Sequence, residues 1–173
     1  VKGHAEGKVA YIRLAIFNLQ AYDKFIKMYA DLRKEIGEDM QGIVLDLRNN
    51  PGGLLNTALF ITDAFISEGE IMSIRPRDEE QSQSFAAAPD NDIAVGLPIV
   101  VLINAGSASA SEIVAGSLQD HNRAIIVGTK SFGKGSVQSI IPLPGGSAIK
   151  LTTARYYLPS GRSIQAGGVT PDI

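Results

Sequence analysis

The sequence of 173 residues contains no cysteine and only two histidines, His4 and His121. The absence of cysteine excludes thiol catalysis, disulfides, zinc–thiolate sites and iron–sulfur clusters. Any mechanism that needs a histidine has only two candidates, and one of them lies almost at the N-terminus. Reactive chemistry in this chain must therefore be sought mainly among other side chains.

Excess charge of one sign and long hydrophobic runs are also missing. The chain has 16 Lys and Arg against 18 Asp and Glu, and this near-neutral balance argues against the clustered excess of basic charge by which proteins bind nucleic acids or anionic membranes. No apolar run approaches the ~18 residues of a membrane span, and no signal segment follows Val1, so we expect a fragment or a mature form. Length and composition predict one globular domain over residues 1–173.

Strand-like and helix-like segments alternate along the chain. Helical spacing of apolar residues predicts helices over 22–36 and 54–66, with Gly37 as a stop, and a third helix after Glu112. Short apolar runs predict strands at 7–17, 43–47, 69–74, 98–103 and 124–128, and hairpin strands at 135–142 and 148–157. The polar stretch 75–92 predicts an exposed loop or hairpin. This alternation predicts an α/β domain with parallel strands and an added antiparallel hairpin.

Two turns combine a strand end with a helix start, at 48–53 and 104–112. Such junctions favour chemistry because the free N–H groups of a helix N-terminus can hold an anion. The second junction contains three serines separated by alanines: Ser107, Ser109 and Ser111. A serine there can be exposed while the next N–H points into the same space, as an oxyanion site requires. The competing interpretation is a helix cap, since Ser109 and Glu112 fit a capping box.

A serine nucleophile needs a base. His121 follows an aspartate, but a helix that runs from Ser109 to His121 would separate them by roughly 18 Å, so we interpret His121 as a solvent-exposed residue at the helix end. Lysine is the alternative, because burial can lower its pKa until a neutral amine exists near neutral pH. Lys130 and Lys134 follow the strand at 124–128, and spacing alone does not choose between them.

Four separated motifs resemble those of the carboxyl-terminal processing peptidases, also called tail-specific proteases. They are Asp46–Gly53 (DLRNNPGG), Asn104–Glu112 (NAGSASASE), Gly128–Gln138 (GTKSFGKGSVQ) and Pro159–Gln165 (PSGRSIQ). The motifs occur in the family's order over nearly the whole chain. The resemblance implies an α/β fold with a ClpP/crotonase-like core, formed here by a single serine peptidase core domain.

The resemblance also implies the catalytic residues. The middle serine of the second motif corresponds to the family's nucleophile and a lysine 25 residues later to its base, which gives a Ser109–Lys134 dyad. Gln138 matches the residue that orients the lysine in many members, and Glu112 matches an acidic position with a supporting role. The resemblance therefore implies a serine endopeptidase in which His121 is not required.

The oxyanion hole implied by the resemblance consists of backbone N–H groups. One belongs to Ala110, and the other to Gly52 or Gly53, between which counting does not decide. The implied reaction is acyl transfer from a peptide to the serine and then to water. No metal and no organic cofactor is implied.

Substrates and partners are likewise expected from the resemblance. Family members cut proteins near their C-termini, and a PDZ domain presents the substrate tail; none of the 173 residues resembles a PDZ carboxylate-binding loop. A homo-oligomer or an activating adaptor is left open, and the expected location is the bacterial periplasm or cell envelope. The alternative function is a catalytically silent core that acts as a binding or assembly scaffold, although the presence of both Ser109 and Lys134 counts against it.

Overall fold

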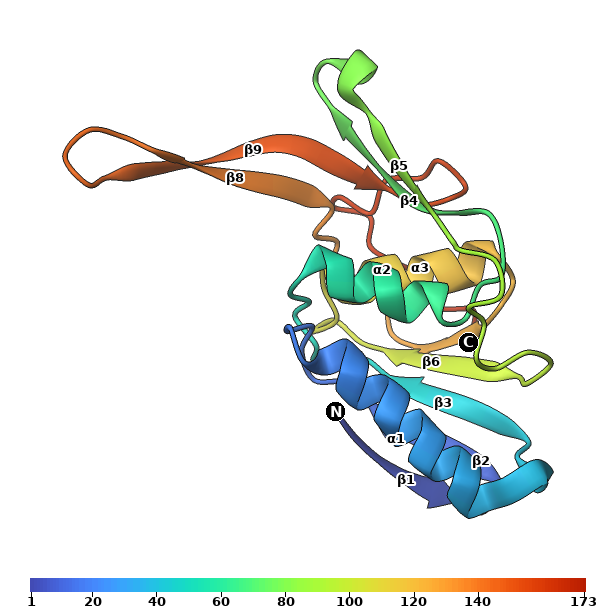
Figure 1. The fold of residues 1–173 in the computed structure, drawn as a ribbon. Coiled ribbons are helices and arrows are strands. Elements are labelled where there is room, and N and C mark those ends of the chain that lie inside the picture. Colours follow the sequence, from blue (N-terminus) through green and yellow to red (C-terminus); the bar gives the residue numbers. More distant parts are fainter.

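The computed structural model describes residues 1–173 and contains two β-sheets with helices between them (Figure 1). The first sheet has the strand order β1-β2-β3-β6-β7, with β1 (Lys2–Glu6), β2 (Val9–Arg13), β3 (Gly42–Asp46), β6 (Ile99–Ile103) and β7 (Ile125–Gly128). The β1–β2 pair is antiparallel and all other pairs are parallel. The carboxyl ends of the parallel strands therefore meet at one edge, where sites form in α/β folds.

The second sheet is antiparallel throughout, with the order β5-β4-β9-β8. Its strands are β4 (Glu70–Pro76), β5 (Gln83–Ala86), β8 (Ser136–Pro142) and β9 (Ala148–Tyr157), and the short 3₁₀ helix η2 (Glu79–Gln81) connects β4 to β5. The β8–β9 hairpin projects from the body of the molecule (Figure 1). This sheet contains the predicted hairpin strands, and the segment predicted as a loop or hairpin over 75–92 supplies β5 and the connection to it.

Three α-helices complete the fold: α1 (Ala21–Ile36), α2 (Leu55–Asp63) and α3 (Ala110–Asp120), with the 3₁₀ helix η1 (Gly37–Asp39) after α1. Helices α2 and α3 pack on each other and lie between the two sheets, whereas α1 packs on β1 and β2 (Figure 1). The α/β class with parallel strands and an antiparallel hairpin is thus confirmed. None of the helices combines the length and the hydropathy that a membrane-spanning segment needs.

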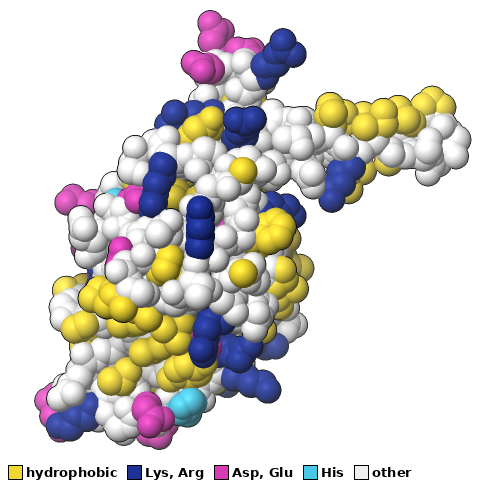
Figure 2. Space-filling model, turned by 180° about the vertical axis from the view of Figure 1, so that it is seen from behind, with side chains coloured by type: hydrophobic (Ala, Val, Ile, Leu, Met, Phe, Trp, Pro, Cys, Tyr) yellow, Lys and Arg dark blue, Asp and Glu magenta, His cyan; other side chains and the backbone are white.

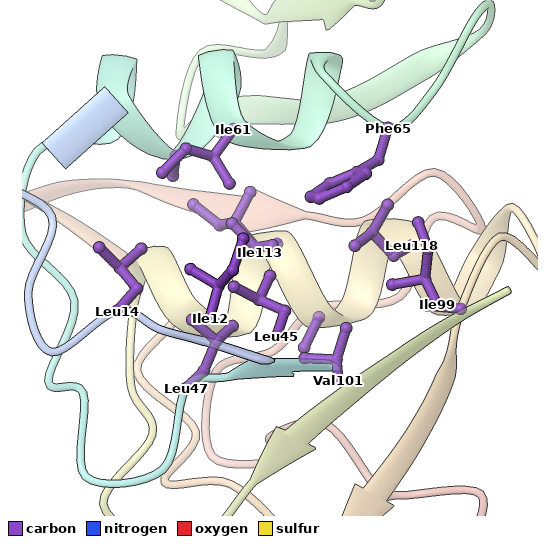
Figure 3. Close-up of a cluster of buried hydrophobic side chains, with 14 of the residues drawn as sticks. Ile12, Leu14, Leu45, Leu47, Ile61, Phe65, Ile99, Val101, Ile113 and Leu118 are labelled. Atoms are coloured by element: carbon purple, nitrogen blue, oxygen red, sulfur yellow. The ribbon is translucent and has the colours of Figure 1, made fainter. Parts of the chain in front are cut away.

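The hydrophobic core lies between the helices and one face of the first sheet (Figure 3). The fully buried apolar side chains on this face alternate along the sequence, as a strand pattern requires: Ile12, Leu45 and Val101 lie on the strands, and Leu14 and Leu47 directly follow β2 and β3. Helices α2 and α3 cover them with Ile61, Phe65, Ile113 and Leu118. The opposite face of this sheet carries half-buried side chains, and Figure 2 shows hydrophobic groups over the lower part of the molecule on that side.

The predicted boundaries are wrong at two places. The strand predicted over 7–17 is shorter, since β2 covers only Val9–Arg13, and the strand β1, which pairs with β2 across the turn at Gly7 (φ 59°), was not predicted. The helix predicted over 54–66 ends at Asp63, and Leu54, the first residue of the predicted helix, is extended at the N-cap and 43% exposed. Phe65 lies beyond the helix and is nevertheless fully buried.

Replacement of Phe65 by alanine tests the core. The ring is fully buried and contacts Phe25 edge-on, with the ring centroids 5.6 Å apart. We expect Phe65→Ala to lower the free energy of unfolding by about 3–5 kcal/mol, since it leaves a cavity. The matched control is Phe60→Ala on the same segment, where a ring that is 54% exposed should contribute less than about half of that. Equal effects in chemical denaturation would contradict this description of the core.

Candidate active site

The turn after β3 and the turn after β6 touch at Gly52 and Ser109. Ser109 is the N-cap of α3 and has the unusual backbone angles φ 57° and ψ −115°. A Cβ atom at Gly52, whose φ is 99°, would lie 2.7 Å from Ala108 O and 2.9 Å from Ala110 N. Only glycine therefore fits this contact, and it lets the two turns form one site at the carboxyl edge of the sheet.

The three serines of the second turn have different environments. The Ser107 hydroxyl is buried and donates to Leu47 O at 2.8 Å, and the Ser111 hydroxyl is buried and donates to Asn50 O at 2.9 Å. Both are thus occupied in joining the two turns. Ser109 is only half-buried. Of the three serines, Ser109 alone is not fully buried.

Glu112 lies in the first turn of α3 and its side chain is completely buried. One carboxylate oxygen, Oε2, accepts hydrogen bonds from Ser109 N at 2.7 Å and Lys134 N at 2.9 Å. The other, Oε1, accepts from the Ser131 hydroxyl at 2.5 Å and Gly133 N at 2.6 Å. Four donors thus replace the water that the buried carboxylate loses, and no cation pairs with it.

The shared oxygen brings together residues that are far apart in sequence. Because Ser109 N and Lys134 N bond to the same atom, they lie within two hydrogen-bond lengths of each other. The Ser109–Glu112 bond is the glutamate half of the predicted capping box, so the cap also belongs to the site. The Lys134 side chain is exposed, and no hydrogen bond joins its amine to the Ser109 hydroxyl in this structure.

The fourth sequence motif holds the loop that carries Lys134. A Cβ atom at Gly135 would lie 2.5 Å from Gln165 N, and Gly135 N donates to Gln165 Oε1 at 3.0 Å. On the other side of the lysine, Gly133 O accepts from Ala166 N at 2.8 Å. The glycines that flank Lys134 therefore permit close backbone packing. Gln138 follows on β8 and is exposed, opposite Thr152.

The two glycines considered for the oxyanion hole differ in their N–H groups. Gly52 is buried and its N–H donates to Asn50 Oδ1 at 2.9 Å. Gly53 is exposed and its N–H has no acceptor in the chain. The Ala110 N–H, at the start of α3, is also without an acceptor. Each of the two turns thus contains one backbone N–H group without an acceptor: Gly53 in the turn after β3 and Ala110 in the turn after β6.

Asn50 is a structural residue that the sequence reasoning missed. Its side chain is fully buried, and Nδ2 donates to Leu14 O at 2.7 Å while Oδ1 accepts from Gly52 N. Its carbonyl oxygen accepts from Ala108 N at 3.0 Å and from the Ser111 hydroxyl. Asparagine before Pro-Gly-Gly is a signal for a turn that bonds to its own backbone. Asn50 thus fixes the first turn and attaches the second turn to it.

Asp46 anchors the beginning of the first turn. Its buried carboxylate accepts from Arg48 Nε at 2.9 Å and Nη2 at 2.8 Å, and from the Tyr11 hydroxyl at 2.5 Å. Burial alone would raise the pKa of Asp46, but the hydrogen bonds from Arg48 and Tyr11 outweigh it and lower the pKa to about 2. Burial and the same carboxylate raise the pKa of Tyr11. Asp46 therefore stays ionised at the end of β3, where the first turn begins.

His121 lies at the opposite end of α3 from Ser109. Its Nε2 is 2.7 Å from Glu70 O, at the start of β4. The expectation of a solvent-exposed residue is wrong, because packing on β4 leaves the ring only partly exposed. The other histidine, His4, is exposed on β1. No three His, Asp or Glu side chains gather closely enough to hold a metal ion.

Asp46 should contribute to the loss of stability of the folded protein at acidic pH. Its pKa is lower in the folded chain, about 2, than in the unfolded chain, so its stabilising effect is complete above about pH 4 and is lost as the pH falls towards 2. The shift corresponds to ~2 kcal/mol. Denaturant titrations at several pH values should show that Asp46→Asn removes this part of the pH dependence, whereas Asp31→Asn, at an exposed aspartate, does not. Parallel profiles for wild type and Asp46→Asn would contradict the assignment.

Glu112→Gln tests the shared carboxylate. The glutamine amide group presents hydrogens to backbone donors that need an acceptor, so at least one buried donor loses its partner. We expect the free energy of unfolding to fall by about 2–4 kcal/mol. Glu35→Gln, at an exposed glutamate of α1, is the control and should change it by less than about 0.5 kcal/mol. Unchanged stability of Glu112→Gln in chemical denaturation would show that the four bonds are not important.

Comparison with known proteins identifies the family. The family model "Peptidase family S41" matches residues 8–173. The chain is 53% identical over 174 residues to a carboxy-terminal-processing protease of Bartonella bacilliformis, covering all of this chain and 40% of that protein. It is 43% identical to the carboxyl-terminal-processing protease of Synechocystis, covering 95% of this chain and 37% of the relative. The chain thus spans about 40% of the length of these relatives.

Solved structures agree with this result. The photosystem II D1 C-terminal processing protease superposes with a TM-score of 0.86 and 37% identity, over 95% of this chain and 42% of that one. The tricorn protease, at 20% identity and a TM-score of 0.57, shares the fold. With the family model covering nearly the whole sequence, the chain belongs to peptidase family S41, among the carboxyl-terminal processing peptidases.

Proposed function

We propose that this domain is the proteolytic core of a C-terminal processing endopeptidase, with Ser109 as nucleophile and Lys134 as base. The observation that carries the proposal is the Glu112 oxygen that accepts from both Ser109 N and Lys134 N. It brings the nucleophile's turn and the lysine's loop to one point. The half-buried state of Ser109, beside two serines with fully engaged hydroxyls, supports the choice of nucleophile.

The proposed reaction is acyl transfer in two steps. Ser109 Oγ attacks the carbonyl carbon of the peptide while its proton passes to neutral Lys134 Nζ. When the C–N bond breaks, the Lys134 ammonium returns that proton to the leaving amine. Water then attacks the ester and gives one proton to Lys134; as the C–O bond to the serine breaks, this proton passes to Ser109 Oγ. The acid product leaves, and both side chains are restored.

The oxyanion formed in each step needs two hydrogen-bond donors. We assign these to the Ala110 N–H and to Gly53 rather than Gly52. The reason is that the Gly52 N–H already bonds to Asn50 Oδ1, whereas the N–H groups of Gly53 and Ala110 have no acceptor in the chain. Gly52 then has a steric role, since it allows the two turns to meet.

Lys134 must be neutral to accept a proton, and lysine favours the neutral form only when water is excluded. Its side chain is exposed in this structure. We therefore propose that bound substrate or another part of the protein covers the amine and directs it to Ser109. Gln138, on the strand that begins two residues after Lys134, is proposed to orient the amine once it is covered.

The substrate and the setting of the enzyme belong to the same proposal. The names of the relatives, carboxy-terminal-processing proteases, support protein substrates that are cut near their C-termini. A PDZ domain for tail capture, a homo-oligomer or activating adaptor, and a location in the periplasm or cell envelope stay predictions. All of them concern the whole protein, and this chain corresponds to only 40% of the length of the Bartonella relative.

Substitution of the dyad tests the mechanism in the whole protein. We expect Ser109→Ala and Lys134→Ala each to reduce cleavage of an unfolded protein substrate by about a thousandfold or more, because the nucleophile and its base act as a unit. Cleavage is measured by the appearance of new amino termini. Thermal unfolding of each variant checks that the fold is retained.

Two matched controls accompany this experiment. Lys130→Ala removes the neighbouring exposed lysine, and His121→Ala removes the histidine at the far end of α3. Both variants should keep nearly full activity. Substantial cleavage by Lys134→Ala, or loss of cleavage in His121→Ala with an intact fold, would refute the Ser109–Lys134 dyad.

A further inference from the structure

A hollow outside the candidate active site is lined by arginines. It has a volume of about 480 Å³ and lies between the end of β4 and the body of β9, where Arg75, Arg77 and Arg155 border it. We call these three residues the arginine groove. Figure 2 shows several Lys and Arg side chains over the upper part of the molecule, where the second sheet lies. All three side chains are exposed, so a partner can reach them.

Two of the arginines directly oppose each other. Arg75 pairs with Arg155 in the antiparallel register of β4 and β9, so both side chains leave the same face of the sheet. Like charges in this position destabilise a sheet. For the stability of the β4–β9 pair alone, an acidic residue opposite an arginine would be more favourable. The chain instead places two positive charges together, which indicates a purpose other than stability.

Arg75 is also held in a fixed orientation. Its guanidinium carbon lies 4.4 Å from the centroid of the Tyr157 ring, and its Nε donates to Ser73 Oγ at 3.4 Å. Stacking on an aromatic face leaves the edge of the guanidinium, with its terminal N–H groups, free for an acceptor. Arg75 is therefore prepared for a planar carboxylate, which a guanidinium can bind with two parallel hydrogen bonds.

The positive charge of the groove is not neutralised within the chain. None of the ion pairs in the structure includes Arg75, Arg77 or Arg155. Glu79 is the single acidic residue on the lining, against three arginines. This excess occurs in a chain whose net charge is −2. The groove is thus complementary to a ligand that carries more than one negative charge.

We propose that the arginine groove binds an acidic peptide segment with two carboxylates on alternate residues. Arg75 is near the end of β4, and Arg77, two positions further along the chain, is the first residue after the strand. Side chains two apart in an extended chain are separated by about 7 Å, so an extended acidic peptide laid along β4 matches their spacing. Arg155 on the adjacent strand adds a third guanidinium beside Arg75. This interaction is separate from peptide cleavage at Ser109.

Fluorescence anisotropy with a labelled peptide tests the proposal. The probe is an uncharged Gly-Ser peptide with a central Glu-Gly-Glu and an amidated C-terminus, so that only side-chain carboxylates are present. Binding is measured in the Ser109→Ala background, which keeps the readout independent of cleavage. We expect saturable binding that weakens with added salt, and at least about tenfold weaker binding of the Gln-Gly-Gln peptide.

Matched arginine variants locate the site. Arg75→Gln and Arg155→Gln should each weaken binding by about tenfold, whereas Arg13→Gln, at an exposed arginine of the first sheet, should leave it unchanged. Thermal unfolding should show no loss of stability in Arg155→Gln, because the change removes a repulsion between like charges.

Several outcomes would overturn the proposal. One is equal binding of the Glu and Gln peptides, and another is unchanged affinity of Arg75→Gln and Arg155→Gln with an intact fold. A third is the absence of peptide binding together with Arg75-dependent binding to phosphatidylserine vesicles, which would assign the groove to membranes. A peptide with Gln-Gly-Gln and a free C-terminal carboxylate that binds as well as the Glu peptide would show recognition of a chain end instead.

Discussion

The buried carboxylate of Glu112 is the interaction on which the arrangement of this site depends. A carboxylate without water is unfavourable unless donors surround it, and here Ser131, Gly133 and Lys134 from one loop and Ser109 from the start of α3 supply four. The loop can satisfy this acceptor only where it lies against α3. The requirement for hydrogen bonds therefore holds together two segments that no strand pairing connects.

The second constraint is the contact between the two strand-end turns. Gly52 lies so close to the backbone around Ser109 that no side chain fits, and Asn50 bonds to both turns through its amide and carbonyl groups. Asp46 and Arg48 fix the first turn where it leaves β3. Ser109 keeps its left-handed backbone because these contacts surround it. The N–H groups of Gly53 and Ala110, one in each turn, have no acceptor within the chain.

Much of the fold could be predicted from the sequence, because the helix at 22–36 and the hairpin strands at 135–142 and 148–157 have clear periodicity and turn signals. Strand β1 was missed, since Lys2, Gly3 and Glu6 are residue types that strands disfavour. The local pattern of Ser109 and Glu112 indicated a cap, but a cap involves only neighbouring residues. The bonds from Glu112 to Ser131, Gly133 and Lys134 depend on tertiary packing, which no spacing reveals.

The most direct test of the proposed Ser109–Lys134 chemistry is to identify the residue that a fluorophosphonate modifies in the whole protein. Mass spectrometry of the labelled peptides should find the adduct on Ser109 alone, and labelling should be lost in Lys134→Ala with the fold retained. Ser107 and Ser111 should stay unmodified because their hydroxyls are buried and engaged. An adduct on Ser107 or Ser111, or labelling of Ser109 at the same rate without Lys134, would contradict the account.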